Sequence, residues 1–491
     1  MTALCWFRSD LRIDDNPALT AALQAGPAYA VFIVAPGQWQ IHQDAPAKIH
    51  FWWRALDALA PELERIGVAI KFLRVDTWQE VPSKLLALCQ TLRVDVVHCN
   101  REHGLYERQR DQACYKILAH AGINMLGHDG HTLFPPGTVR TGNDDYYRVF
   151  SPFARACRGR LQAQASTLLS PLPALPLQTI PNHMVADQLT DIWPECEATQ
   201  GLSANQRDTL SAYWPVTPKA VHDRLDTFTL APIKQYQSLR DLPAQSGTSQ
   251  LSPYLASGLV SAKTCLIKAL AANHGAIEKG NEGVLTWINE ILWREFYQHL
   301  LHGYPKLSMH QPLRDDTIGL PWRDAPEDFK AWCEARTGIP IVDAAMRQLV
   351  TLGWMHNRLR MIVAMFLTKN LLIDWHLGEA FFMQHLIDGD LAANNGGWQW
   401  SASTGADSAP YFRVFNPVSQ SAKFDADGVF IRKWVPELSS LDNKSIHDPT
   451  DAQRKSVGYP MAIVDLKMSR VRAIEVFKNH LSSQTTYYSS I

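Results

Sequence analysis

Short apolar runs alternate with amphipathic ones over the first hundred residues. The runs ALCWF, AYAVFIVA, AIKFLRV and VDVVHCN have the length and apolar character of buried strands. Between them, IHFWWRALDALAPELERIG and VPSKLLALCQTL have helical periodicity. Strands that alternate with helices indicate βαβ units, so the sequence predicts an α/β domain with a doubly wound, mainly parallel sheet.

Closely spaced prolines interrupt this pattern after residue 170, which indicates a linker. Beyond residue 213 the pattern is helical almost throughout, with period-3.6 apolar stripes in LTWINEILWREFYQHLL and MHNRLRMIVAMFLTKNLLIDW and a last helix over DLKMSRVRAIEVFKNHL. We predict an α/β domain over 1–165, a Pro-rich interdomain linker over 166–206, an all-α domain over 207–480 and a short polar tail over 481–491.

The composition is typical of a globular protein, because 46% of the 491 residues are hydrophobic and 19% are charged. A formal net charge of −1 argues against a nonspecific polyanion binder, so any nucleic-acid surface must be a local patch. The 8 cysteines show neither a CxxC pair nor metal-ligand spacing, which indicates reduced thiols, no metal site and a cytoplasmic location. No apolar stretch reaches membrane-spanning length. No GxGxxG follows the first strand, which argues against a dehydrogenase-type dinucleotide site.

The segment IDGDLAANNGGWQWSASTGADSAPYFRVFNP is the richest in unlike chemistries. It combines the carboxylates Asp388 and Asp390, the amides Asn394 and Asn395, two glycines and two tryptophans. Such a set suits a flat cofactor with a polar edge. The alternative is a buried turn whose Asp and Asn side chains cap neighbouring helices.

A second candidate site is the hydroxyl-rich run SGTSQLSPY at 246–254. We expect Ser252 to act as N-cap and Pro253 to be the first helical residue. A helix amino terminus with nearby hydroxyl groups can bind phosphate. An ordinary capped helix is the alternative.

These motifs, with IPIVDAAMRQL, GWMHNRLRM and the amino-terminal LCWFRSDLRIDDNPAL, resemble the photolyase/cryptochrome flavoproteins, and within them the bacterial class I cyclobutane pyrimidine dimer photolyases. The resemblance covers nearly the whole chain. It implies an α/β antenna domain, a helical FAD-binding domain and a carbon–carbon lyase that repairs pyrimidine dimers in light. In this reaction photoexcited reduced FAD donates an electron to a dimer that has flipped out of the DNA.

The resemblance implies a cofactor site in which Asn394 faces flavin N5, while Asp388 and Asp390 lie near the flavin ring and Arg360 pairs with Asp388. The segment 248–252 is expected to hold the FAD pyrophosphate. The full set of expected FAD residues is Tyr236, Thr248, Ser249, Gln250, Leu251, Ser252, Trp287, Glu290, Arg294, Trp354, Asn357, Arg360, Asp388, Gly389, Asp390 and Asn394.

The resemblance also implies a DNA site, in which Trp293 and Trp400 contact the flipped dimer and Glu290 hydrogen-bonds the damaged bases. For the tryptophans of this helix alone, a core stripe is the alternative. The expected DNA residues are Arg240, Glu290, Trp293, Arg294, Asn357, Arg358, Met361, Trp400 and Gln420, and Lys423, Arg413 and Lys306 either extend this patch or are solvated surface charges.

Trp398, Trp375 and Trp322 match a relay that carries electrons from the protein surface to photoexcited oxidised flavin. With Glu290 and Asn394, they complete the expected catalytic set.

For the antenna chromophore, His42 and Glu107 match folate-using relatives, but Tyr106 replaces an Asn and Met309 a Lys. We expect 5,10-methenyltetrahydrofolate, with deazaflavin or an empty pocket as alternatives. Glu107 could instead be a helix-surface residue paired with Arg108 or Arg110.

The substrate is expected to be UV-damaged DNA, single- or double-stranded, and the protein a monomer without a protein partner. A signalling cryptochrome is the main alternative, against which stand Glu290, Met361 and Asn394. A six-four photolyase would need paired histidines, whereas Asn357 follows His356. A dark flavin oxidoreductase lacks a visible nicotinamide site.

Overall fold

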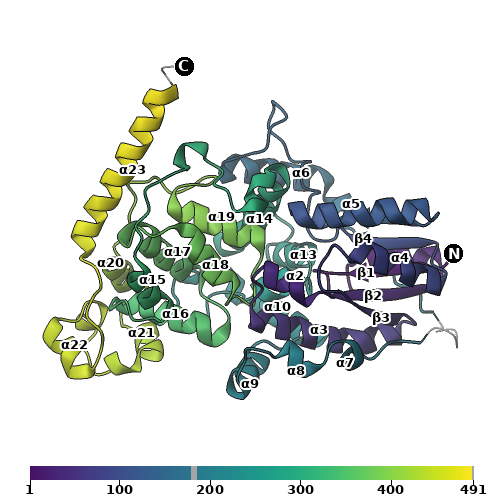
Figure 1. The fold of residues 1–491 in the computed structure, drawn as a ribbon, viewed down its shortest axis with the longest axis horizontal. Helices are drawn as coiled ribbons and strands as arrows, with labels where there is room; N and C mark the ends of the chain where they lie inside the picture. Colours follow the sequence, from purple (N-terminus) through teal and green to yellow (C-terminus); the bar gives the residue numbers. More distant parts are fainter. Residues whose placement is uncertain (179–184, 489–491) are drawn as a thin grey trace. The chain divides into compact units, whose positions relative to one another are not determined.

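The structure is a computed structural model that describes residues 1–178 and 185–488. Its contacts divide the chain into two units, drawn in sequence colours in Figure 1. Unit 1 comprises Met1–Gln235, Ser249–Ser308 and Ile387–Ala392, and unit 2 comprises Tyr236–Thr248, Met309–Leu386 and Ala393–Ile491. The boundaries predicted at 165 and 206 follow the change in secondary-structure class, whereas the contacts group several helices beyond residue 206 with the α/β region.

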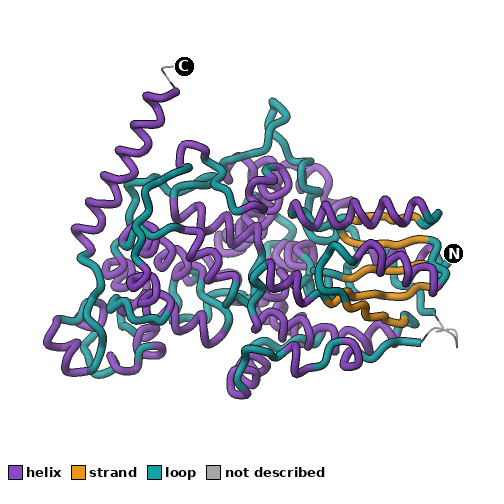
Figure 2. The backbone as a smooth tube through the Cα atoms, in the orientation of Figure 1, coloured by secondary structure: helices purple, strands orange, loops and turns teal. Residues whose placement is uncertain are grey.

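Unit 1 contains a five-stranded, wholly parallel sheet, shown in orange in Figure 2. Its strands are β1 (Ala3–Phe7), β2 (Ala28–Val34), β3 (Ala69–Arg74), β4 (Val96–Asn100) and β5 (Asn124–His128), in the order β3-β2-β1-β4-β5. The doubly wound α/β prediction is therefore confirmed. The order reverses beside β1, and the carboxyl ends of strands at such a point are where ligands bind in this class of sheet.

The first helices of unit 1 are α1 (Pro17–Ala25), α2 (Pro36–Ile41), α3 (Pro46–Arg65), α4 (Val81–Leu92), α5 (Leu105–His120) and α6 (Phe150–Leu168). Helices α3, α4 and α5 run alongside the strands in Figure 1. Asn16 caps α1 by accepting from the N–H of Leu19, and Pro17 occupies the first position, which has no use for an N–H donor. Helices α4 and α5 pack Leu85 and Cys114 against strand residues such as Trp6.

The remaining helices of unit 1 are α7 (Leu189–Ile192), α8 (Glu195–Ala198), α9 (Ala204–Tyr213), α10 (Pro218–Leu230), α12 (Ser252–Ala256), α13 (Ala262–Ala272) and α14 (Glu282–Gly303). The two short helices α7 and α8 lie in the predicted linker, which is therefore not wholly irregular, and its residues 179–184 lie outside the described part.

Unit 2 is helical, as predicted for this part of the chain. Its helices are α11 (Tyr236–Leu239), α15 (Pro326–Cys333), α16 (Pro340–Leu352), α17 (Asn357–Met365), α18 (Trp375–Met383), α20 (Pro417–Phe424), α21 (Val429–Trp434), α22 (Asp451–Val457), α23 (Leu466–Tyr488) and most of α19 (Leu391–Ala402). The predicted tail over 481–491 is wrong in its first part, because α23 continues to Tyr488; residues 489–491 lie outside the described part.

Two local predictions also need correction. The stripe over 355–375 is not one helix: α17 gives way to a π-helical turn (Phe366–Asn370), and α18 starts anew at Trp375 with Asp374 as its cap. The buried turn offered as the alternative for the 387–417 segment is wrong for Gly396 and Gly397, which lie inside α19. Burial of Trp398 in the core of unit 2 supplies the packing that offsets the low helix propensity of glycine.

None of the helices in the described residues is both long and apolar enough to span a membrane. Across the same residues, no His, Cys, Asp or Glu side chains group together as metal ligands. All eight cysteines are free thiols, and six of them are buried.

Candidate functional site

Helix α14 carries four of the expected site residues in unit 1. Asn281 caps it by accepting from the N–H of Val284, and Trp287, Glu290, Trp293 and Arg294 follow at helical spacing. Trp287 is buried, and its indole N–H lies 3.4 Å from Ser249 Oγ. One expected cofactor residue therefore positions another within the same unit.

Trp293 and Arg294 are held by neighbours that the sequence did not indicate. Phe150 stacks on Trp293 with ring centroids 3.7 Å apart and planes 6° from parallel, so one face of the indole is covered. Arg294 donates from Nη1 to the carbonyl of His131 at 2.8 Å and from Nη2 to the His131 ring at 2.8 Å. Burial, with the charge of Arg294, lowers the pKa of His131 well below its usual value. A neutral His131 is the state that can accept this hydrogen bond.

The loop before α12 has the backbone shape of an anion site. The backbone of Gln250 is in the left-handed helical region with φ +52°, and that of Leu251 is in the right-handed helical region. This succession points consecutive backbone N–H groups into one concave site. The predicted cap is wrong: Leu251 is the N-cap and Ser252 is the first helical residue. The left-handed turn at Gln250 moves the start of the helix back by one residue. The loop nevertheless fits the pyrophosphate expected there.

The segment with the two carboxylates is braced by unit 1 side chains. Gln298 Nε2 donates to Asp390 Oδ2 at 3.1 Å, and Lys48 Nζ donates to the carbonyl of Gly389 at 2.6 Å. Asp388 is buried. Gln298 lies on the helix predicted from the sequence, but nothing in the sequence connects Lys48 with this segment.

In unit 2, the orientation of Asn394 is fixed by α18. Asn394 Nδ2 donates to the carbonyl of Glu379 at 3.0 Å, and Asn395 Nδ2 donates to Glu379 Oε1 at 2.9 Å. Among the described residues, none donates to Asn394 Oδ1. This oxygen is thus available to an N–H donor, which is what reduced flavin offers at N5. Glu379 also hydrogen-bonds His310 and thereby raises the pKa of that imidazole.

The three tryptophans expected to form the relay all belong to unit 2, and their exposure increases toward Trp322. Trp398 is 2% exposed and Trp375 is 1% exposed, whereas Trp322 is partly exposed and packs against Phe477 of α23. Trp398 lies so close to Gly378, one turn after Trp375, that a Cβ there would collide with the indole. Sequence reasoning missed Trp332, which is buried with its ring 6.1 Å from that of Trp398.

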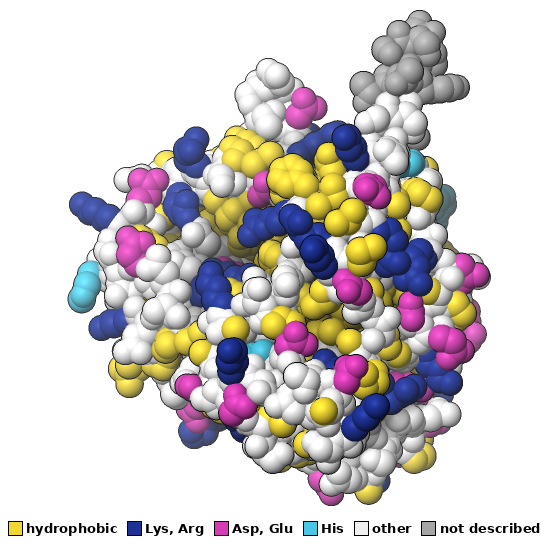
Figure 3. Space-filling model, turned by 90° about the vertical axis from the view of Figure 1, so that its left-hand side faces the viewer, with side chains coloured by type: hydrophobic (Ala, Val, Ile, Leu, Met, Phe, Trp, Pro, Cys, Tyr) yellow, Lys and Arg dark blue, Asp and Glu magenta, His cyan; other side chains and the backbone are white. Residues whose placement is uncertain are grey.

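The expected DNA-backbone arginines of unit 2 share a carboxylate. Arg358 Nη2 lies 2.9 Å from Asp241, and Arg240 lies 3.9 Å from the same side chain. Arg358 also covers the ring of Phe424. On the face drawn in Figure 3, Lys and Arg side chains occur in small groups among apolar ones, which fits a local patch rather than a field of one sign.

The other expected residues of unit 2 differ in exposure. Tyr236 and Trp354 are buried; Thr248, Arg360, Met361, Trp400 and Gln420 are partly exposed; and Asn357 is exposed. Of the basic side chains proposed to extend the patch, Lys423 and Arg413 are exposed.

The expected antenna residues lie together in unit 1. The rings of His42 and Tyr106 are 6.5 Å apart, and Trp78 meets His42 edge-on at 4.7 Å. Glu107, in the first turn of α5, folds back over Gly104. Burial raises the pKa of Glu107 to about 7, with a further contribution from the charge of Glu102. The helix-surface alternative is not supported, because Arg110 pairs with Glu102 and Asp111 instead.

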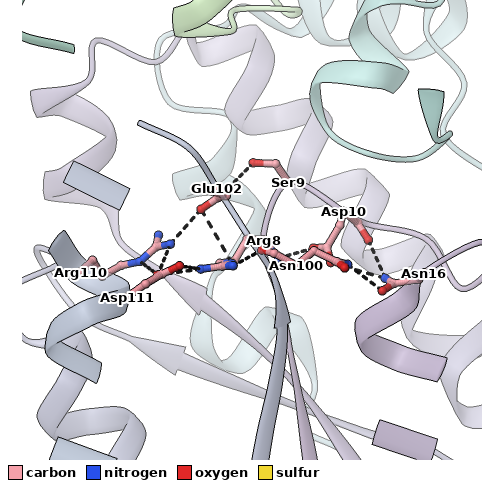
Figure 4. Close-up of polar contacts among 8 residues, drawn as sticks. All are labelled: Arg8, Ser9, Asp10, Asn16, Asn100, Glu102, Arg110 and Asp111. Atoms are coloured by element: carbon pink, nitrogen blue, oxygen red, sulfur yellow. Dashed lines mark hydrogen bonds and ion pairs between the residues drawn. The ribbon is translucent and has the colours of Figure 1, made fainter. Parts of the chain in front are cut away.

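Behind the antenna residues lies a buried ionic network at the carboxyl ends of β1 and β4, shown in Figure 4. Arg8 pairs with Asp111 at 2.7 Å, and Arg110 pairs with Glu102 at 2.9 Å. Burial alone would raise the pKa of Glu102, but the two guanidinium groups hold it well below its usual range. These charged residues are plain in the sequence, but they become neighbours only because β1 pairs with β4 in the sheet.

The chain combines an α/β unit, which has a polar network at the carboxyl ends of β1 and β4, with helices. These helices are accompanied by a loop with the backbone shape of an anion site, several tryptophans and a carboxylate segment held by hydrogen bonds. Such a combination is typical of a two-part protein that binds a nucleotide cofactor. The comparisons with known proteins specify the family. A DNA photolyase model matches residues 3–176, and a model of the FAD-binding domain of DNA photolyase matches residues 287–479.

Relatives match over almost the entire chain. A deoxyribodipyrimidine photo-lyase of Vibrio cholerae is 42% identical over 97% of this chain and 99% of its own, and one from Escherichia coli is 40% identical over 97% and 98%. A bacterial class III photolyase from Agrobacterium tumefaciens superposes with a TM-score of 0.86 at 34% identity, covering 98% of this chain and 97% of that one. A cryptochrome of Synechocystis gives 0.82 at 26% identity, covering 97% and 99%. This chain belongs to the DNA photolyase family.

Proposed function

We propose that this protein is a light-driven DNA repair enzyme that binds FAD and splits cyclobutane pyrimidine dimers. The observation that carries the proposal is the held amide of Asn394, whose Nδ2 donates to Glu379 so that Oδ1 is presented for an N–H of reduced flavin. Two relatives at 40% identity or more over their full length, both called deoxyribodipyrimidine photo-lyase, support the same activity.

When bound and reduced, FAD absorbs near-ultraviolet or blue light and supplies the electron that splits the dimer. The protein side chains bind and orient. The loop at Gln250 and Leu251 holds the phosphates through backbone N–H groups. Trp293, held by the stacked ring of Phe150, contacts an extruded base, and Glu290 on the same helix hydrogen-bonds that base.

DNA contact in this proposal relies on Arg240 and Arg358 as the phosphate ligands. The carboxylate they share in the free protein keeps both side chains ordered before DNA arrives. The protein acts as a monomer in the cytoplasm, and its eight free cysteines support the reducing compartment.

For the antenna we propose 5,10-methenyltetrahydrofolate, because His42, Tyr106 and Glu107 lie together and Glu107 can accept from a pterin edge. Another loading has a precedent: an archaeal photolyase from Sulfolobus tokodaii, 26% identical with a TM-score of 0.79, was solved with two FAD molecules. Protein reconstituted with folate should show an extra near-ultraviolet band that Glu107→Ala removes. A second flavin or a deazaflavin band would refute this assignment.

The decisive experiment follows dimers in an irradiated oligonucleotide incubated with reduced holoenzyme. Dimers should disappear under blue light and persist in the dark. Persistence in the light with a fully reduced flavin would refute repair. Signalling would then be the better account, consistent with the likeness to the Synechocystis cryptochrome.

A further inference from the structure

Lys48 lies at a position where both the helix dipole and burial disfavour a positive charge. It occupies the first turn of α3, where the helix dipole is positive, and it is only 8% exposed. A lysine in such a place is expensive unless its ammonium is fully partnered. A residue type that lowers folding stability at its position is typical of a functional site.

The ammonium group of Lys48 has two hydrogen-bond acceptors and one aromatic ring as neighbours. It lies 2.6 Å from Asp44 Oδ1, donates to the carbonyl of Gly389 at 2.6 Å and sits 4.7 Å from the centre of the Trp52 ring. Gly389 separates Asp388 from Asp390, the two carboxylates expected at the flavin ring. Lys48 therefore fixes the peptide between them while Gln298 holds Asp390 from another side.

The opposite side of the same ion pair borders the expected antenna residues. Asp44 lies two residues after His42, and its N–H donates to the carbonyl of Trp39 at 2.9 Å, which closes the end of α2. His42 responds to both charges: burial lowers its pKa, Asp44 opposes that change and Lys48 adds to it. One buried pair thus contacts the flavin segment and acts on the antenna histidine, all within unit 1.

We propose that Lys48 is a positioning residue that braces the 388–390 segment for FAD and couples FAD binding to occupancy of the antenna pocket. The proposal rests on the function proposed above. Because coupling between two ligands is reciprocal, a brace shared by both sites makes each ligand favour the other. Lys48 touches neither reacting atoms nor the dimer; it acts through Gly389 and Asp44.

The first test measures FAD dissociation from the apoprotein by fluorescence for wild type, Lys48→Met, Lys48→Arg and the control Lys84→Met, which changes an exposed lysine on α4. Loss of a charge-assisted hydrogen bond should weaken FAD binding by about tenfold in Lys48→Met. Lys48→Arg, which keeps charge and donors, should recover most of the loss, and the control should match wild type. Wild-type affinity in Lys48→Met would overturn the brace.

The second test repeats the titration with saturating methenyltetrahydrofolate. FAD should bind wild type several-fold more tightly with folate present, and this difference should vanish in Lys48→Met. Equal affinities with and without bound folate in wild type would overturn the coupling. If the protein binds no folate, the antenna assignment is refuted instead. The FAD affinities of the Lys48 variants would still test whether Lys48 positions the 388–390 segment. If Lys48→Met does not fold, Asp44→Asn replaces it, and wild-type FAD affinity in that variant would refute the proposal.

Discussion

Glu107→Gln should stabilise the apoprotein, and by an amount that depends on pH. Glu107 has a folded-state pKa of about 7, raised from 4.5 mainly by burial. The native state therefore holds a proton that the unfolded state releases between these values, and stability falls as pH rises through this window. Below pH 4.5 the penalty is absent, and above pH 7 it is complete.

The magnitude follows from the same values. A change of one in pKa corresponds to about 1.4 kcal/mol, so the rise to about 7 sets an upper limit of about 3 kcal/mol. Solvent reaches part of the side chain and screens the charge, which reduces the expected penalty. We expect the advantage of the glutamine variant to grow by about 1–2 kcal/mol between pH 5 and pH 8.

Urea unfolding of the apoprotein, followed by far-ultraviolet circular dichroism at four pH values, measures this difference. Glu64→Gln is the matched control, because it makes the same substitution at an exposed position on α3. A glutamine variant of Glu107 whose advantage is constant with pH, or which is less stable at pH 8, would show that the carboxyl is not buried as the structure has it.

Four further outcomes are expected. Trp322→Phe should abolish photoreduction of oxidised FAD but leave repair by chemically reduced enzyme intact, because the relay only prepares the cofactor; normal photoreduction would point to another donor. Glu290→Ala should lower the repair quantum yield several-fold with a smaller loss of affinity for damaged DNA, as the proposed hydrogen bond from Glu290 to the bases requires, and equal losses would make it a binding residue only. Arg240→Gln should flatten the salt dependence of DNA binding by roughly one unit, as expected for one lost phosphate contact, and an unchanged slope would remove it from the footprint. Glu379→Gln should lower the pKa of His310 in an NMR titration, because the Glu379 hydrogen bond raises it; an unchanged titration would contradict that bond.

Periodicity predicted four of the five strands, including the edge strand β3, and missed the other edge strand, β5. The strands β1, β2 and β4 are wholly buried and read as continuous apolar runs. β5 has the sequence NMLGH and is partly exposed along its length, so it carries neither an apolar run nor clean alternation. It forms because β4 offers a free edge with matching register.

The sequence predicted site residues that are neighbours along the chain. It missed those that contact the site only because the folded chain brings them close. The carboxylates and amides of the 388–395 segment stand together on the chain, and a motif reveals them. Lys48 and Glu379 hydrogen-bond that segment from 341 and 16 residues away, and each is a single charged residue that the sequence pattern places on the surface. The partners of a buried polar group are set by topology, which periodicity does not encode.

The charge balance of the antenna region argues that it is built for a ligand. Within the network of Figure 4, the charges of Arg8 and Arg110 are matched by those of Glu102 and Asp111. Glu107 adds one more carboxyl beside these four groups, and no cation among the described residues forms an ion pair with it, because Arg110 pairs with Glu102 and Asp111. A ligand that donates N–H groups to Glu107 would replace the lost solvation, as a pterin edge does. The pH-dependent advantage of Glu107→Gln should therefore shrink when folate is bound. If the advantage persists unchanged at saturating folate, the carboxyl does not meet the chromophore.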